Sequence, residues 1–290
     1  MLQKVVVLLS VAFNLATANS RAFEVHGHRG ARARFPENTL PAFEHALKAG
    51  VDALEMDVNV TKDRVLVVHH DRKISPDTCL TYSGERINPA PVIYDLTLAQ
   101  LKKFDCGSLK NPDFRNQQTV PNTEIPTLEE VLNWLDKSSI PMAKRVKLNI
   151  ETKISPEEPD SSPTPAIFAK LLIDLLKKKK YIDRVVLQSF DYRTLVEARK
   201  IYPKIKISAL TDSSSEDLVK TASELKADFI SPRWTLVQYR TVEKLHALGV
   251  KVLPWTVNDR LAWAQLNVMG VDGIITDDPE ALIAFLAPPK

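Results

Sequence analysis

The stretch "ALEMDVNVTKDRVLVVHHD", residues 53–71, sets two acidic residues inside an otherwise apolar run. A short, nearly continuous apolar run is typical of a strand that is buried on both faces, as in a parallel sheet. Glu55 and Asp57 are two positions apart, so their side chains share one face of the strand. After the polar turn "TKD", the extended "RVLVVHHD" brings His70 and Asp71 back beside it. The stretch therefore predicts a buried strand whose end carries reactive groups.

Apolar runs of the same kind recur along the chain and alternate with amphipathic helical stretches. The predicted strands are residues 23–28, 53–58, 146–151, 185–189, 205–210, 228–231, 251–256 and 273–276. The predicted helices are residues 40–50, 127–137, 166–180, 194–202, 215–227, 236–249, 259–270 and 279–286. This repeated alternation predicts an α/β fold of the (β/α)8 TIM-barrel class, and a doubly wound open sheet is the competing architecture.

Two segments exceed what such a barrel needs. Residues 72–125 form a small insertion between the second strand and its helix, with one clear helical stretch at 97–104. Residues 155–165, "SPEEPDSSPTP", form a proline-rich acidic loop after the third strand. Loops this long usually carry function or a substructure of their own. We expect the second segment to be a stiff surface loop rather than a lid.

The first twenty residues have the pattern of a secretory signal peptide. Lys4 precedes an apolar stretch, and small residues follow, so cleavage after Ala18 or Ser20 would leave a single domain of residues 21–290. The alternative is a buried first helix. We therefore expect export, to a periplasm or out of the cell. No later run reaches the roughly 20 apolar residues of a membrane span, so no stable span is expected.

The chain has only two cysteines, Cys79 and Cys106, and both lie in the insertion. In an exported protein such a pair predicts one disulfide, whereas two free thiols are the alternative without export. Closing a ring of this size stabilises the fold by roughly 3 kcal/mol.

The composition is that of an ordinary globular protein, with 44% hydrophobic and 26% charged residues. A formal net charge of +3 does not predict nucleic-acid binding. It also gives no preference for an oligomeric state.

Polar side chains gather at the ends of the predicted strands, where (β/α)8 barrels carry their reactive groups. His28 and Arg29 end the first strand, and Glu151 and Lys153 end the third. The later strands end at Gln188-Ser189, at Trp255 with Asn258 beyond it, and at Thr276-Asp277.

Three carboxylates, Glu55, Asp57 and Glu151, are expected to meet at this end of the barrel. Without a cation they would repel one another and be costly to bury in ionised form. A hard divalent cation, Mg²⁺ or Ca²⁺, removes that cost and prefers oxygen ligands. Zinc would more often recruit histidine or cysteine. The sequence thus predicts a site for one Mg²⁺ or Ca²⁺ ion.

His28 and His70 remain as a pair for proton transfer, with Arg29 and Lys153 as positive charges. A metal, two cations and two imidazoles around one cavity suit an anionic ester such as a phosphodiester. The positive groups would neutralise charge on the phosphate. One imidazole would deprotonate a nucleophile, and the other would protonate the leaving alcohol.

The chain resembles the glycerophosphodiester phosphodiesterases. The resemblance rests on "GHRGARARFPENTLPAFEHALKAGVDALEMDVNVTKDRVLVVHHD", followed in order by "IETK", "QSF", "PWTVND" and "ITDDP". It implies an acid–base pair of His28 and His70, metal ligands Glu55, Asp57 and Glu151, and phosphate contacts from Arg29 and Lys153. A glycerol hydroxyl would attack the phosphorus, and water would open the cyclic phosphate. The expected products are glycerol 3-phosphate and an alcohol.

Other assignments complete the hypothesis. Trp255 is expected to form an apolar wall for the substrate, and Glu37 of "PENTL" to approach the site. His69 and His26 are expected to be structural. The enzymatic alternative is a related barrel phosphodiesterase that acts on lysophospholipids, sphingolipids or phosphoinositides. The non-enzymatic alternative is an exported binding module without catalysis.

Overall fold

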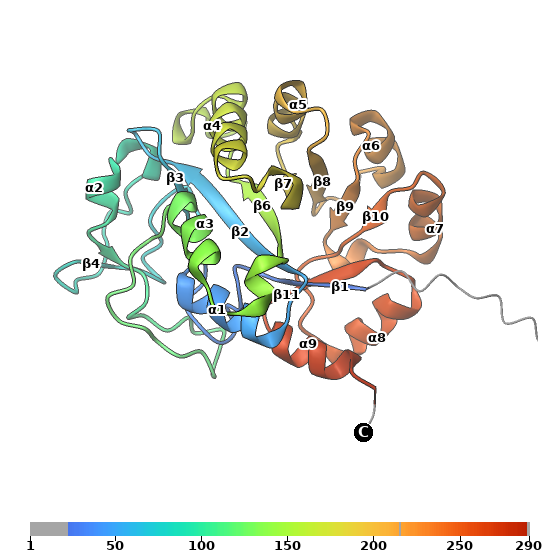
Figure 1. The fold of residues 1–290 in the computed structure, drawn as a ribbon, viewed down its shortest axis with the longest axis horizontal. Coiled ribbons are helices and arrows are strands. Elements are labelled where there is room, and N and C mark those ends of the chain that lie inside the picture. Colours follow the sequence, from blue (N-terminus) through green and yellow to red (C-terminus); the bar gives the residue numbers. More distant parts are fainter. Residues whose placement is uncertain (1–22, 215, 289–290) are drawn as a thin grey trace, which may run out of the picture.

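A computed structural model describes residues 23–214 and 216–288 of the chain and has a barrel of parallel strands surrounded by helices (Figure 1). The strand order around the sheet is β10-β9-β8-β7-β6-β2-β1-β11. The predicted signal peptide, residues 1–20, lies outside the described residues. Within the described part of the chain, no helix has the length and apolar character needed to cross a membrane.

The barrel strands lie close to the positions that the apolar runs predict. They are β1 Glu24–Gly27, β2 Ala53–Val60, β6 Lys147–Thr152, β7 Val185–Ser189, β8 Lys206–Thr211, β9 Phe229–Pro232, β10 Lys251–Val252 and β11 Gly273–Thr276. Backbone hydrogen bonds from Val257 N to Ile275 O (3.0 Å) and from Asp272 N to Val252 O (2.9 Å) join the two edges of the sheet. The (β/α)8 fold class is confirmed, and the open-sheet alternative is wrong.

The outer layer consists of α1 Leu40–Ala49, α3 Leu128–Lys137, α4 Pro165–Lys178, α5 Tyr192–Ile201, α6 Leu218–Leu225, α7 Tyr239–Ala247, α8 Arg260–Val268 and α9 Pro279–Leu286. Side-chain caps begin several of these helices. Thr127 accepts from the backbone of Glu130, and the Glu130 side chain accepts in return from the Thr127 N–H. Short 3-10 helices, at residues 93–95, 141–144, 159–161, 182–184 and 234–236, connect other elements.

The seventh barrel strand is shorter than its apolar run. The run predicts a strand over residues 251–256, but β10 ends at Val252. Pro254 has no backbone N–H to donate to the neighbouring strand, so the regular ladder cannot continue through it. Trp255 still forms one isolated parallel bridge with Arg233.

The second strand returns on itself as the sequence predicts. β3, Leu66–Val68, pairs antiparallel with the end of β2, with Val58 opposite Val68 and Val60 opposite Leu66. The chain then reaches His70 beside the carboxyl end of β2.

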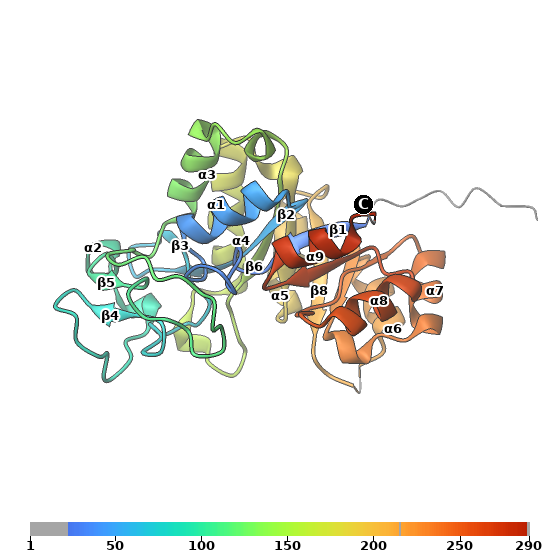
Figure 2. The same cartoon turned by 90° about the horizontal axis from the view of Figure 1, so that it is seen from below.

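The insertion, residues 72–125, forms a small substructure beside the barrel (Figures 1 and 2). β4, Leu80–Thr81, pairs with β5, Phe104–Asp105, so α2 spans only Leu98–Leu101 and the longer predicted helix is wrong. Cys79 and Cys106 form the predicted disulfide. The insertion has its own apolar cluster, which is composed of Val67, Ile74, Cys79, Ile87, Ile93, Leu101, Cys106 and Ile125.

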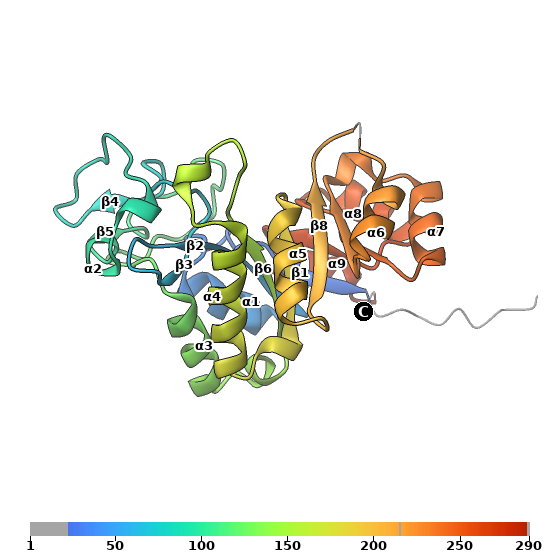
Figure 3. The same cartoon turned by 90° about the horizontal axis from the view of Figure 1, so that it is seen from above.

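The acidic loop after β6 lies beside the insertion, on the same side of the barrel (Figures 2 and 3). Arg72 donates from Nε and from one terminal nitrogen to Glu158 Oε2, at 3.0 and 2.8 Å. This ion pair joins the beginning of the insertion to the loop near the mouth of the barrel.

A buried carboxylate closes the opposite, amino-terminal end of the barrel. Glu24 lies 3.0 Å from Lys147 Nζ and 2.9 Å from Lys251 Nζ, and its other neighbour is His26 at 3.3 Å. Burial opposes ionisation, but the hydrogen bonds from His26 and the lysines outweigh it and hold the pKa of Glu24 far below its usual range. Polar groups at this end of a barrel serve stability.

We predict that Glu24→Gln lowers the free energy of unfolding at pH 7 by about 1–3 kcal/mol, because the amide cannot balance two lysines. Urea denaturation measures the difference. The pKa of Glu24 is lower in the folded state than in the unfolded state. Its stabilisation is therefore present above about pH 4.3 and is lost in acid, where the two proteins should converge.

Glu44→Gln is the matched control. Glu44 makes an exposed ion pair with Lys48 on α1, and its loss should cost less than about 0.5 kcal/mol. Equal effects of the two substitutions would show that the barrel end does not depend on Glu24.

Candidate active site

A cavity of about 450 Å³ opens at the carboxyl end of the barrel strands. It is lined by His28, Arg29, Arg32, Glu55, His70, Glu151, Lys153, Gln188, Phe190, Leu210, Trp255, Thr256 and Ile275. Seven of the eight residues that the sequence predicts for the site therefore line one cavity. The eighth, Asp57, is 1% exposed and contacts Arg29 and Lys153.

Two larger hollows lie beside this cavity, near the acidic loop. One of about 490 Å³ shares Glu151, Lys153 and Phe190 with it, and one of about 580 Å³ lies between the insertion and the start of α4. The smaller cavity is the better candidate for chemistry, because it alone among them is lined by both histidines and Arg29.

The three predicted carboxylates form a buried cluster. Glu55, Asp57 and Glu151 each offer an oxygen that lies within 4.8 Å of the others. The register of the sheet explains this arrangement, since Asp57 on β2 lies opposite Glu151 on β6, and Glu55 is two positions earlier on the same face of β2.

Neutral donors hold Glu55 in place. Its Oε1 accepts from Gln188 Nε2 at 3.0 Å, and its Oε2 accepts from the backbone N–H of Arg29 at 2.7 Å. Burial raises the pKa of Glu55 well above its usual value, and the charges of Asp57 and Glu151 raise it further.

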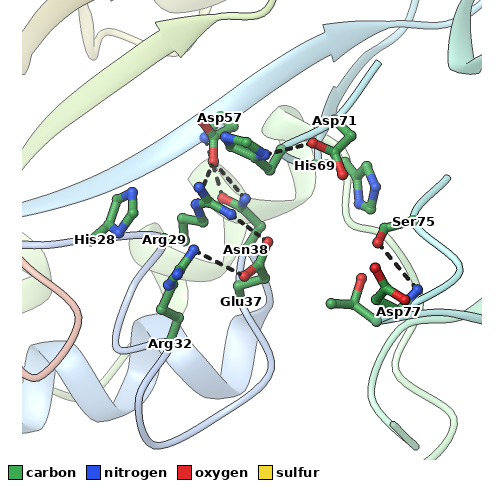
Figure 4. Close-up of polar contacts among 12 residues, drawn as sticks. His28, Arg29, Arg32, Glu37, Asn38, Asp57, His69, Asp71, Ser75 and Asp77 are labelled. Carbon is green, nitrogen blue, oxygen red and sulfur yellow. Dashed lines mark hydrogen bonds and ion pairs between the residues drawn. The ribbon is translucent and has the colours of Figure 1, made fainter. Parts of the chain in front are cut away.

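Asp57 has a more positive environment. Its Oδ2 accepts from Asn38 Nδ2 at 2.8 Å and lies 3.4 Å from Arg29 Nε (Figure 4). Burial opposes ionisation, but positive charge on His70, Lys153 and Arg29 holds the pKa of Asp57 well below its usual range. Its Oδ1 is buried and has no hydrogen-bond donor among the described residues.

Glu151 is balanced only in part. Its Oε1 accepts from Lys153 Nζ at 2.7 Å. Burial nevertheless raises the pKa of Glu151, and the attraction of Lys153 does not overcome burial and the charge of Asp57 together.

The cluster therefore fits a hard divalent cation. Its oxygens converge, one of them is buried with no hydrogen-bond donor in the described part of the chain, and two of its carboxylates have raised pKa values. A cation among these oxygens would offset the repulsion between the carboxylates and would also give Asp57 Oδ1 a positively charged partner.

Each of the two histidines has an aspartate beside its Nδ1, but His28 is more buried than His70. His28 Nδ1 lies 2.5 Å from Asp277 Oδ1, and His70 Nδ1 lies 2.8 Å from Asp71 Oδ1. Burial lowers the pKa of His28, and the attraction of Asp277 only partly offsets this. In both rings Nε2 is the nitrogen that remains for a substrate.

The turn "HRG" explains how Arg29 enters the site. Arg29 and Gly30 both have a positive φ, 50° and 86°, so the chain reverses directly after β1. A Cβ on Gly30 would come within 2.7 Å of the backbone of Ala42, and therefore only glycine fits there. The turn directs the guanidinium of Arg29 toward Asp57 and Glu37 (Figure 4).

Glu37 reaches the site through the arginines, as expected. It accepts from Arg29 at 2.7 Å and lies 3.5 Å from Arg32. Burial lowers the pKa of Arg29, but the charges of Glu37 and Asp57 raise it above its usual value, so the guanidinium stays charged.

The lining of the cavity also includes two aromatic side chains. Trp255 donates from its indole nitrogen to Ser231 O at 2.8 Å, and its ring meets Phe190 edge-on with 5.4 Å between the ring centroids. Phe190 is 42% exposed, which places an aromatic face where a substrate could contact it.

The remaining four histidines do not line this cavity. His26 is buried deeper in the barrel, between Glu24 and Asn149, and His69 is buried as well. His45 and His246, on the outer helices α1 and α7, are half-buried and pair with Glu280 and Asp272.

Several residues contribute that the sequence analysis does not assign to the site. They are Arg32, Asn38, Gln188, Phe190 and Asp277. The sequence already places Gln188 and Asp277 at strand ends, but no pattern in it assigns them a role. Asn38 has a φ of 57°, a conformation that the sequence does not reveal.

We predict that Glu151→Gln raises the unfolding temperature of the metal-free protein, measured in excess chelator. The raised pKa of Glu151 means that its ionised form is less stable in the folded protein than in the unfolded chain. Glutamine has nearly the same shape but no charge, so the substitution removes the free-energy cost of burying this charge. A gain of about 1 kcal/mol corresponds to roughly 2–4 °C. The difference in unfolding temperature between the variant and the wild type should disappear below about pH 4.3, where Glu151 is protonated in both the folded and the unfolded protein.

Glu157→Gln, in the exposed acidic loop, is the control and should leave the unfolding temperature unchanged. A Glu151→Gln protein that unfolds below the wild type in chelator would contradict this account of the cluster.

The chain is similar to known proteins over most of its length. Residues 28–281 match the glycerophosphoryl diester phosphodiesterase family. A glycerophosphodiester phosphodiesterase of Caldanaerobacter subterraneus is 32% identical, over 89% of this chain and 96% of that protein. One of Bacillus altitudinis is 31% identical, over 90% and 96%. The crystal structure of a glycerophosphodiester phosphodiesterase from Parabacteroides distasonis, 26% identical, covers 91% of this chain and 96% of its own, with a TM-score of 0.68.

Proposed function

Since the chain belongs to the glycerophosphoryl diester phosphodiesterase family, we propose that it hydrolyses glycerophosphodiesters to glycerol 3-phosphate and an alcohol, with a bound divalent cation and two histidines. The enzyme class, a phosphoric diester hydrolase, follows from this membership. The observation that supports the finer proposal is the meeting of a carboxylate cluster, two imidazoles and two cationic side chains in one cavity.

Glu55, Asp57 and Glu151 would hold the cation, which is Mg²⁺ or Ca²⁺ on the chemistry of the ligands. When bound, it supplies positive charge that offsets the negative charge of the phosphate oxygens. Asp57 Oδ1 supports this assignment, because no described residue donates a hydrogen bond to it and Lys153 Nζ is 3.7 Å away.

Arg29 and Lys153 would bind the phosphate. Burial lowers the pKa of Lys153, but the charges of Glu151 and Asp57 raise it above its usual value, so it stays protonated. The side chains of Arg29 and Lys153 are largely buried and are held by carboxylates. Both line the cavity, so neither has to move to meet a phosphate there.

His28 and His70 would move the protons. One imidazole accepts the proton of a glycerol hydroxyl as that oxygen attacks phosphorus, and the other gives a proton to the leaving alcohol oxygen. The products of this step are a cyclic phosphate and the free alcohol. Water then opens the cyclic phosphate with the proton transfers reversed, which gives glycerol 3-phosphate and returns both rings to their first state.

Trp255 and Phe190 would pack against the carbon skeleton of the substrate. They line the same cavity as the charged side chains. A cavity with both charged and aromatic lining suits a substrate with one anionic and one less polar part.

We also propose that the protein is exported. The signal-like residues 1–20 support this, and so does the Cys79–Cys106 disulfide, since such bonds persist in oxidising compartments.

We predict that Asp57→Asn abolishes cation-dependent hydrolysis, because it withdraws a charged ligand. Release of glycerol 3-phosphate from glycerophosphocholine by the wild type should fall at least about 100-fold in excess chelator and recover with Mg²⁺ or Ca²⁺. The variant should not recover.

Asp63→Asn, in the turn after β2, is the control and should remain active and chelator-sensitive. Full wild-type activity in excess chelator would refute the metal assignment. Activity on a lysophospholipid, but not on glycerophosphocholine, would favour the alternative substrate class.

We further predict that His28→Ala lowers kcat by about 100-fold to 10,000-fold, while binding of the substrate persists. His45→Ala, on the outer helix α1, should change kcat little. Steady-state kinetics and equilibrium dialysis measure the two effects. Unchanged turnover in His28→Ala would remove the acid–base role from this residue.

A further inference from the structure

The first and last strands of the barrel bring a carboxylate against His28. Asp277 follows β11, which pairs in parallel with β1, and 249 residues separate it from His28 in the sequence. Its Oδ1 lies 2.5 Å from His28 Nδ1. The backbone joins them as well, because His28 N donates to Thr276 O at 2.8 Å.

Asp277 is itself held on every side. Asn258 Nδ2 donates to Oδ2 at 2.6 Å, and Asn258 Oδ1 accepts from the Asp277 N–H at 2.9 Å. Arg32 Nε lies 2.9 Å from Oδ1. With both oxygens engaged and only 3% of the residue exposed, the carboxylate has little freedom to turn away.

The charges around the pair favour an ionised aspartate beside a neutral imidazole. Burial raises the pKa of Asp277, but the effects of His28, Arg32 and Asn258 are larger and opposite. The pKa of Asp277 therefore lies below its usual value. Burial lowers the pKa of His28, and the positive charges of Arg29 and Arg32 lower it as well. Together these effects outweigh the opposing attraction of Asp277. A neutral ring beside a carboxylate donates its N–H to that carboxylate.

We propose that Asp277 is a positioning residue that holds His28 as the tautomer with its proton on Nδ1, so that Nε2 is the unprotonated nitrogen that meets the substrate. Among the described residues none bonds to Nε2, and His28 lines the cavity. Without Asp277 the ring could rotate or carry its proton on Nε2, and its lone pair would then point away from the reaction. The inference rests on the proposed role of His28.

The second histidine shows what is particular about this pair. Asp71, which lies 2.8 Å from His70 Nδ1, has a side chain that is 53% exposed, against 4% for Asp277. Water competes for the hydrogen bonds of an exposed carboxylate, so Asp71 restrains its ring less. The geometry therefore assigns the fixed tautomer to His28.

Asp277→Asn tests the proposal, because the amide keeps the size of the carboxylate but also offers an N–H to the ring. We expect kcat for glycerophosphocholine to fall about 100-fold or more, with KM little changed. Asp278→Asn is the matched control. Asp278 caps α9 and pairs with Arg34, away from His28, so its kcat should stay within about twofold of the wild type.

The imidazole ¹⁵N chemical shifts provide a readout that a structural role would not move. The chain has six histidines, and the His28 signals are those that disappear in His28→Ala. The wild type should show a protonated Nδ1 and an unprotonated Nε2, and Asp277→Asn should show a mixture of tautomers or a protonated Nε2.

Three results would overturn the proposal: a protonated Nε2 in the neutral wild type, an unchanged tautomer in Asp277→Asn despite lost activity, or wild-type kcat in that variant. If Asp277→Asn does not fold, the wild-type spectrum alone decides. The spectrum also separates this inference from the proposed function, because it can be recorded even if no glycerophosphodiester is hydrolysed.

Discussion

The burial of three carboxylates within 4.8 Å of one another is the constraint on which the rest of the site depends. Carboxylates this close repel one another, and burial makes each charge more costly. The neighbouring strands each supply a compensating group: the N–H of Arg29 after β1, Gln188 at the end of β7 and Lys153 after β6. The compensation remains incomplete, since Asp57 Oδ1 has no donor among the described residues. The repulsion within a site of this kind lowers folding stability, and the same charges favour binding of a cation.

The pKa values of buried glutamates are shifted in opposite directions at the two ends of the barrel. At the amino-terminal end, Glu24 is matched by two lysines and a histidine, and its pKa is far below normal. At the carboxyl-terminal end, Glu55 and Glu151 have raised pKa values although cationic side chains are near. A carboxylate that the protein alone satisfies is structural. One that the protein leaves unsatisfied is a candidate for a ligand, and this distinguishes the two ends without reference to any relative.

The sequence alone predicts the barrel because buried parallel strands appear as apolar runs, and it predicts the acidic cluster because side chains alternate along a strand. It fails where distant residues decide the outcome. The pairing of β4 with β5 shortens the helix of the insertion. Pro254, by contrast, lies within the predicted run of residues 251–256 and already argues against a regular strand there. The turn that delivers Asn38 to Asp57 depends on a positive φ. Asparagine adopts this conformation more often than most residues, but the sequence does not specify it at this position. No local pattern marks Asp277 as the partner of His28.

Closure of the barrel completes the part of the site around His28. β1 has β2 on one side and β11 on the other, so His28 and Arg29 are in place only when the first and last strands have paired. The same pairing brings Asp277 to His28 and lets Ala33 N donate to Asp277 O at 3.1 Å. A chain that lacks β11 would keep the carboxylates of β2 and β6 together but would leave the His28 ring unrestrained. The proposed cation site and the proposed acid–base role of His28 thus depend on different parts of the barrel. Opening the barrel between β1 and β11 would disturb His28 before it disturbs the carboxylates of β2 and β6.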